Sequence, residues 1–104
     1  MLTPVMQFNL PANLHYYVRI SKLFGQPIQG LSLRDAAQQS VVAVQQLKQD
    51  IGLTHTLADF RLTEKRFDEI VDEAMLSGNI PVNPRSPTRD DMRLLLLQAM
   101  KGEV

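Results

Sequence analysis

The sequence predicts an all-α protein, a small helical bundle whose helices are separated by loops that contain proline or glycine. Three observations support this class. Apolar residues recur at spacings of three and four, residues that cap helices recur along the chain, and the period-two alternation of a half-buried strand is absent. The valine-rich run 41–44 lies inside a longer helical pattern, so it does not indicate a strand. The 104 residues are expected to form a single domain over 1–104.

The first two helices are predicted in the segments 3–9 and 13–24. Thr3 is a candidate N-cap, and Pro4 suits the first helical position. The second helix should end at Gly25, because glycine readily adopts the left-handed conformation that closes a helix. One side of this helix should face the core. That side comprises Leu14, Tyr17, Val18 and Phe24.

The longest helix is predicted between Ser32 and Gly52. Ser32 and Asp35 resemble a capping box in which aspartate takes the place of glutamate. Apolar or small residues at helical spacing should form the buried face. They are Leu33, Ala37, Val41, Val44, Leu47 and Ile51. Glutamines along the same helix should form its polar face or else meet a partner helix. They are Gln38, Gln39, Gln45, Gln46 and Gln49.

The remaining sequence predicts one short turn and two further helices. Residues 56–59 suggest the turn, after which Phe60 and Leu62 should fill the core. Thr63 should cap a helix that continues to residue 77. Its buried face comprises Phe67, Ile70, Val71 and Ala74. Thr88 should cap the last helix, which ends before a glycine. The buried face there comprises Met92, Leu95, Leu96 and Ala99.

Composition argues against several classes of function. Lys plus Arg and Asp plus Glu both number 11, so the formal net charge is zero and no broad electrostatic surface for nucleic acid is expected. The absence of cysteine excludes disulfides, thiolate metal ligands and a cysteine nucleophile. No apolar run approaches the length of a membrane span, and the first residues do not resemble a signal peptide. A cytoplasmic protein without nucleic-acid or membrane partners is expected.

No residue pattern indicates catalysis or metal binding. His15 and His55 lie 40 positions apart, and neither belongs to an H-E-x-x-H pair, so both are expected at the surface. Nucleotide-binding glycine motifs and a nucleophile elbow are absent. Four carboxylates cluster in one predicted helix and are expected to form a solvated face. They are Asp68, Glu69, Asp72 and Glu73. No catalytic, cofactor-binding or metal-ligating residue is therefore assigned.

Five stretches, in order and with matching spacing, resemble iron-containing (group III) alcohol dehydrogenases. Residues 2–9 are similar to the L-L-P-x-V-M-x-F-N stretch of that family, and residues 17–20 are similar to its Y-x-R-I helix. Residues 50–53 resemble its D-I-G-I-P exit, and residues 56–60 take the place of S-L-R-E-L. Residues 83–88 are similar to the N-P-R-P-x-T sequence that precedes the final helix.

The resemblance implies the C-terminal helical part of the dehydroquinate synthase-like, iron-containing alcohol dehydrogenase fold. Members join an N-terminal NAD(P)-binding α/β domain to a helical domain whose divalent metal, usually iron, is held by one Asp and three His. The last of these ligands belongs to an H-G-x-x-N-A segment upstream of the stretch that residues 2–9 resemble. No position of this chain matches a metal ligand or a cofactor-binding residue. The NAD(P)-binding domain is expected to be absent. NAD(P) and the metal are expected to be bound by the parent enzymes of the family and not by this chain.

One position is a candidate for the substrate pocket. Family members often carry a cysteine six residues before the arginine of their N-P-R motif, and an ungapped match places Asn79 there. Asn79 would then be a polar group that lines the pocket. The alternative is that Asn79 is a loop residue whose backbone tolerates the turn after Gly78.

Two functions from different classes remain open at this point. The first is the C-terminal part of an NAD(P)-dependent alcohol or aldehyde oxidoreductase, inactive alone. The second is a free-standing helical interaction domain derived from the same family. The first predicts exposed apolar helix faces, which would bind a second copy or the missing family domain, whereas the second predicts a compact monomer.

Overall fold

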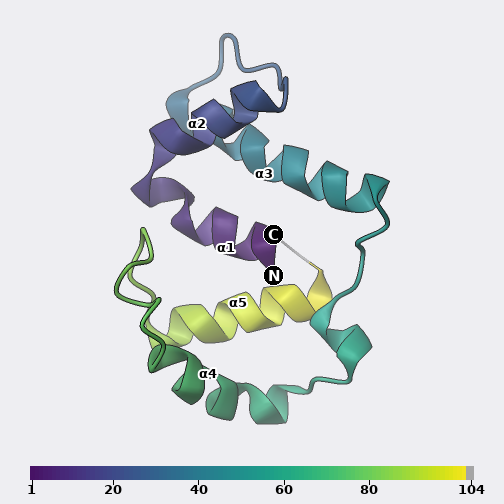
Figure 1. Ribbon diagram of the computed structural model, residues 1–104, viewed down its shortest axis with the longest axis vertical. Helices are drawn as coiled ribbons and strands as arrows, with labels where there is room; N and C mark the ends of the chain where they lie inside the picture. Colours follow the sequence, from purple (N-terminus) through teal and green to yellow (C-terminus); the bar gives the residue numbers. More distant parts are fainter. Residues whose placement is uncertain (103–104) are drawn as a thin grey trace.

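The computed structural model describes residues 1–102, and these residues contain five α-helices, three 3-10 turns and no strand (Figure 1). The helices are α1 (Leu2–Asn9), α2 (Leu14–Leu23), α3 (Leu33–Asp50), α4 (Phe67–Met75) and α5 (Arg89–Lys101). The 3-10 turns are η1 (Leu10–Ala12), η2 (Leu57–Phe60) and η3 (Glu64–Arg66). The all-α prediction is confirmed.

The helices form two lobes that share α1. Helices α2 and α3 pack together at one end of the molecule, α4 and α5 pack together at the other, and α1 lies between α3 and α5 (Figure 1). Each lobe has its own apolar cluster. The first comprises Met6, Leu10, Ala37, Val41 and Val44, with Leu14, Tyr17 and Val18 packed against it. The second is centred on Phe67, Val71 and Leu96.

The predicted cap at the start of α5 is confirmed. The Thr88 hydroxyl accepts a hydrogen bond from the Asp91 amide at 3.2 Å, and the Asp91 carboxylate accepts one from the Thr88 amide at 2.9 Å. These hydrogen bonds hold the pKa of Asp91 below its usual range. At Ser32 only half of the predicted capping box is present. The Ser32 hydroxyl accepts a hydrogen bond from the Asp35 amide at 3.1 Å, but the Asp35 carboxylate accepts none from the Ser32 amide.

Helix starts differ from the predictions in two places. Helix α1 begins at Leu2, so Thr3 is not its cap, and the Thr3 side chain is 2% exposed inside the structure. Pro4 is then the third helical residue, a position that still needs no intrahelical acceptor for an amide hydrogen. The predicted helix from Thr63 begins as the turn η3 and becomes α-helical only in α4, and the Thr63 side chain makes no capping bond.

The buried face of α3 is shorter than predicted. Ala37, Val41 and Val44 are buried, as expected. Leu33, Leu47 and Ile51 are exposed, so their assignment to the buried face is wrong. The side chains that cover α3 come from α1, η1 and α2 and meet only its central turns. Helical spacing identified the correct side of α3, but not how much of it is covered.

Two predicted core residues are also exposed. Phe60 is 71% exposed and lies edge-on to the His55 ring, with the ring centroids 6.0 Å apart. Phe24 is exposed at the end of α2. Leu62 is partly buried against the second cluster, as predicted. Both misplaced aromatic residues lie where a helical turn ends, beyond the reach of the neighbouring helices.

The acidic residues of α4 form a solvated face, as predicted, and they also pair with α5. Arg93 contacts Asp68 at 3.0 Å, and Arg89 contacts Asp72. All four side chains are exposed, and pairs of this kind contribute roughly 0–1 kcal/mol each. The buried side chains Phe67, Val71 and Leu96 therefore dominate the packing of α4 on α5.

The molecule is open for its size. Its accessible surface is 6962 Å² at 11.8 kDa, and the Cα radius of gyration is 14.8 Å. A compact monomer of this mass exposes about 5,900 Å², and a compact chain of this length has a radius of gyration of about 13 Å. The excess of roughly 1,000 Å² is accompanied by exposed apolar side chains in several segments. These include Leu23, Val42, Leu76 and Val82.

Replacing Thr88 by Ala should lower the free energy of unfolding by about 1 kcal/mol, because the Asp91 amide loses its acceptor at the start of α5. Urea unfolding followed by circular dichroism measures this change. Thr54→Ala is the matched control, since Thr54 is exposed and lies in a loop. Equal losses in the two variants would contradict a capping role for Thr88.

Candidate substrate pocket

The Asn79 position lies at an apolar cavity of about 180 Å³ between α1, the loop 79–87 and α5. Apolar side chains from these three segments form most of its wall. They are Met1, Val5, Phe8, Ile80, Pro87, Met92 and Leu95. The only amide side chains in the lining are Asn79 and Asn83. A cavity of this kind suits a small molecule with a short apolar part and one or two hydrogen-bonding groups.

Asn79 itself is exposed at the mouth of this cavity. Its backbone amide donates to the Ser77 hydroxyl at 3.2 Å, which stabilises the turn after α4. Gly78 does not have a positive φ, so that turn does not depend on a left-handed glycine. The structure thus brings Asn79 to a cavity wall, while its role towards a substrate stays a prediction.

The loop 79–87 is held against the end of α1 by a reciprocal pair of amides. The Asn83 side-chain nitrogen donates to Asn9 Oδ1 at 2.7 Å, and the Asn9 side-chain nitrogen donates to Asn83 Oδ1 at 3.1 Å. Asn83 also donates to the Arg85 carbonyl. Asn9 is only 6% exposed, so this pairing satisfies a buried polar group. Nothing in the sequence around Asn9 indicates this pairing.

Arg85 makes a second connection from the loop to α1. Its Nη1 atom donates to the Phe8 carbonyl at 3.0 Å, and its guanidinium carbon lies 4.2 Å from the centroid of the Phe8 ring. Helix α1 has no basic residue in its own last turn. Arg85 therefore supplies the cation that a helix C-terminus favours, from a position 77 residues later in the chain.

Tyr17 links this region to the first apolar cluster. Burial raises the pKa of the Tyr17 hydroxyl above its usual range, and a hydrogen bond with Asn9 acts in the opposite direction. The cavity itself is built from side chains of α1, the loop and α5.

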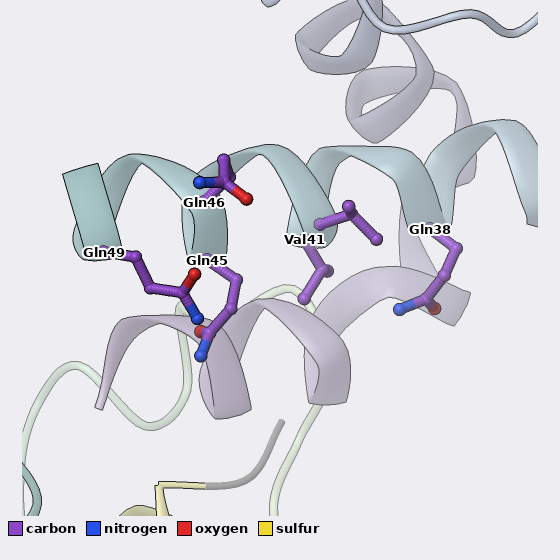
Figure 2. A pocket seen from close by; sticks show the side chains of 6 residues that line it. Gln38, Val41, Gln45, Gln46 and Gln49 are labelled. Carbon is purple, nitrogen blue, oxygen red and sulfur yellow. The ribbon is translucent and has the colours of Figure 1, made fainter. Parts of the chain in front are cut away.

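The predicted glutamine face forms a separate groove on α3. Figure 2 shows the labelled side chains along α3. The groove that they line has a volume of about 190 Å³. The lining comprises Gln38, Val41, Val42, Gln45, Gln46 and Gln49. Gln38 pairs with Gln7 of α1 at 2.8 Å, and Gln45 Oε1 is buried without a hydrogen-bond partner in the structure. Gln46 and Gln49 are exposed, as expected of a polar face, whereas Gln38 meets helix α1 of the same chain.

The described residues do not fit a metal centre. His15 and His55 are both exposed, as predicted, and His55 lies 3.9 Å from Asp59. Across residues 1–102, no three His, Cys, Asp or Glu side chains lie close enough together to hold a metal ion. Within the same residues, no helix combines the length and apolar content that a membrane span requires.

Comparison with known proteins gives the same class as the fold. The profile of the Fe-containing alcohol dehydrogenase family, C-terminal, matches residues 1–100. The 1,3-propanediol dehydrogenase of Klebsiella pneumoniae is 33% identical over 99 residues, which cover 95% of this chain and 26% of that enzyme. The NAD-dependent methanol dehydrogenase of Bacillus methanolicus is 26% identical, with 92% and 25% covered.

Solved structures agree. A crystal structure of 1,3-propanediol oxidoreductase matches 94% of this chain and 26% of its own, with a TM-score of 0.89 and 34% identity. An alcohol dehydrogenase from Oenococcus oeni matches 95% of this chain and 26% of its own, with a TM-score of 0.88 and 31% identity. The chain belongs to the iron-containing alcohol dehydrogenase family. It corresponds to the C-terminal helical part of that fold and spans about a quarter of the length of the curated relatives that it matches.

The raised pKa of Tyr17 predicts a loss of stability in strongly alkaline solution. The folded protein holds the Tyr17 proton more tightly than the unfolded chain does, so its contribution to stability is complete below the unfolded pKa and is lost as pH rises through the folded pKa. Absorbance titration should show a tyrosine component that ionises late. Tyr17→Phe should remove this component and Tyr16→Phe should retain it. The opposite result would show that Tyr17 is not the perturbed residue.

Proposed function

We propose that this chain is the C-terminal helical module of an NAD(P)-dependent, metal-dependent alcohol or aldehyde oxidoreductase, and that it supplies one wall of the substrate pocket. The cavity at Asn79 is the observation that carries this proposal. The cavity is small and mostly apolar and has two amide side chains. The names of the relatives refer to 1,3-propanediol, methanol and lactaldehyde, all small molecules with one or two oxygen atoms. Such substrates match the size and polarity of the cavity.

The chain should be inactive by itself. The described residues offer no ligand set for a metal, and the sequence has no glycine-rich nucleotide motif. Hydride transfer needs a nicotinamide held against the reacting carbon, and in this family a metal supplies polarisation of the substrate oxygen. These groups would come from a polypeptide that supplies the rest of the fold. A cytoplasmic location stays a prediction from the sequence.

The open surface supports a partner that covers apolar helix faces. The excess of roughly 1,000 Å² over a compact monomer is similar to the ~800 Å² that each partner buries in a standard protein interface. We assign this partner as the remainder of a family fold, because the chain matches about a quarter of its relatives over nearly its whole length. A second copy of the chain is the alternative partner. A free-standing interaction domain should instead be compact, and the comparisons give it no better support.

Purified chain should contain no stoichiometric iron and should not reduce NAD with 1,3-propanediol as the substrate. Metal analysis by mass spectrometry and absorbance at the NADH band measure both. The Klebsiella pneumoniae 1,3-propanediol dehydrogenase is the positive control. Stoichiometric iron together with alcohol-dependent NADH formation by these 104 residues would refute the proposal that the reactive groups lie elsewhere.

Titration of the isotope-labelled chain with 1,3-propanediol should shift the NMR signals of residues around the cavity, with weak affinity. The expected responses are at Phe8, Asn79 and Ile80, because these side chains line the cavity. Signals of Gln45 and Gln46 on α3 serve as an internal control, since they line a different groove. Shifts confined to the α3 groove, or none at all, would argue against the Asn79 cavity as an alcohol site.

A further inference from the structure

We infer that Asn9, Asn83 and Arg85 are positioning residues. Together they form a latch that holds the loop 79–87 against the end of α1 and thereby fixes the shape of the Asn79 cavity. That the cavity receives an alcohol rests on the proposed function. The latch itself rests only on contacts within the chain, so the two can be tested separately.

The loop depends on this latch because its own backbone hydrogen bonds lie in its first half. The Ile80 amide donates to the Ser77 carbonyl, and the Asn83 amide donates to the Ile80 carbonyl. Beyond Asn83, the chain passes through two prolines before the cap of α5 at Thr88. Proline has no amide hydrogen to donate. The side chains of Asn83 and Arg85 therefore provide the contacts of this half of the loop with α1.

Each partner in the latch is suited to its position. A carboxamide both donates and accepts, so Asn9 and Asn83 can satisfy one another at a site where Asn9 has almost no contact with water. Aspartate at either position would lose one of the two bonds. Arg85 combines a planar donor with stacking on an aromatic ring, which lysine does not reproduce.

The latch acts on the cavity because two of its contacts are cavity walls. Phe8 lines the cavity and receives both the hydrogen bond and the stacking contact of Arg85. Asn83 lines it from the loop side and is tied to Asn9, the residue after Phe8. Release of the latch would let these two walls move apart. The geometry thus links loop anchoring to the width of the site.

Amide hydrogen exchange of the folded chain tests the latch without any ligand. In Asn83→Ala, the amides of residues 80 and 83 should exchange at least about tenfold faster, since the three hydrogen bonds of the Asn83 side chain are lost. Amides in the middle of α3 should keep their rates. Ser86→Ala is the matched control, because Ser86 is an exposed residue of the same loop.

Coupling between the two amides gives a second test. Asn9→Ala should accelerate the hydrogen exchange of the same loop amides. In the double variant these amides should exchange little faster than in the faster single variant, because the pair is lost once either partner is removed. If Asn9→Ala does not fold, Asn83→Ala still decides, since Asn83 is only partly buried. Unchanged loop exchange in Asn83→Ala, or equal acceleration in α3, would overturn the latch.

Binding of 1,3-propanediol tests the positioning role. Asn83→Ala and Arg85→Lys should weaken the alcohol response at Ile80 about threefold or more, while the Ser86→Ala protein should respond like the unchanged chain. Equal alcohol binding in all variants would overturn positioning of the cavity. Loop opening in Asn83→Ala, in a protein that binds no alcohol at all, would refute the proposed function and leave the latch intact.

Discussion

The structure depends on one short helix that is packed from both sides. Helix α1 places Met6 in the first apolar cluster, next to Leu10 of η1, and it places Val5 and Phe8 at the cavity that it shares with α5. The two lobes have separate clusters, so α1 and its contacts are the main physical connection between them. A change that displaces α1 would affect the core of one lobe and the cavity of the other together. The cavity is thus a feature of how the lobes are joined.

The parts of this fold that the sequence predicts well are those that depend on neighbouring residues. The cap of α5 is local, since Thr88 and Asp91 are three positions apart and satisfy each other. Burial at the ends of helices depends instead on distant segments. Ile51 and Phe60 have the hydrophobicity of core residues, but no other element reaches far enough to cover them. Helical periodicity predicts which way a side chain faces, but not whether another element covers it.

The candidate site was predictable only in part for a related reason. Asn79 was identified by the resemblance of its loop to a family motif, since nothing in its local sequence distinguishes it from an ordinary turn residue. The pairing of Asn9 with Asn83 crosses 74 positions, and a single asparagine near the end of a helix carries no signal of a distant partner. Arg85 illustrates the same limit, because α1 receives its C-terminal cation from the loop after α4. Long-range polar pairs become visible only when the chain is folded.

Under the proposed function, the parts of a family fold would have different roles in catalysis. The described residues build a cavity wall and its anchoring, but they offer no ligand set for the metal. Under the proposed function, this module would influence which alcohols fit, while the rest of a family fold would activate them. Substrate preference depends on the shape and polarity of the wall, and a residue such as Asn79 can alter both without contacting a metal or a cofactor. The latch then matters for selectivity because it sets the distance between Phe8 and the loop, a dimension to which a small ligand is sensitive.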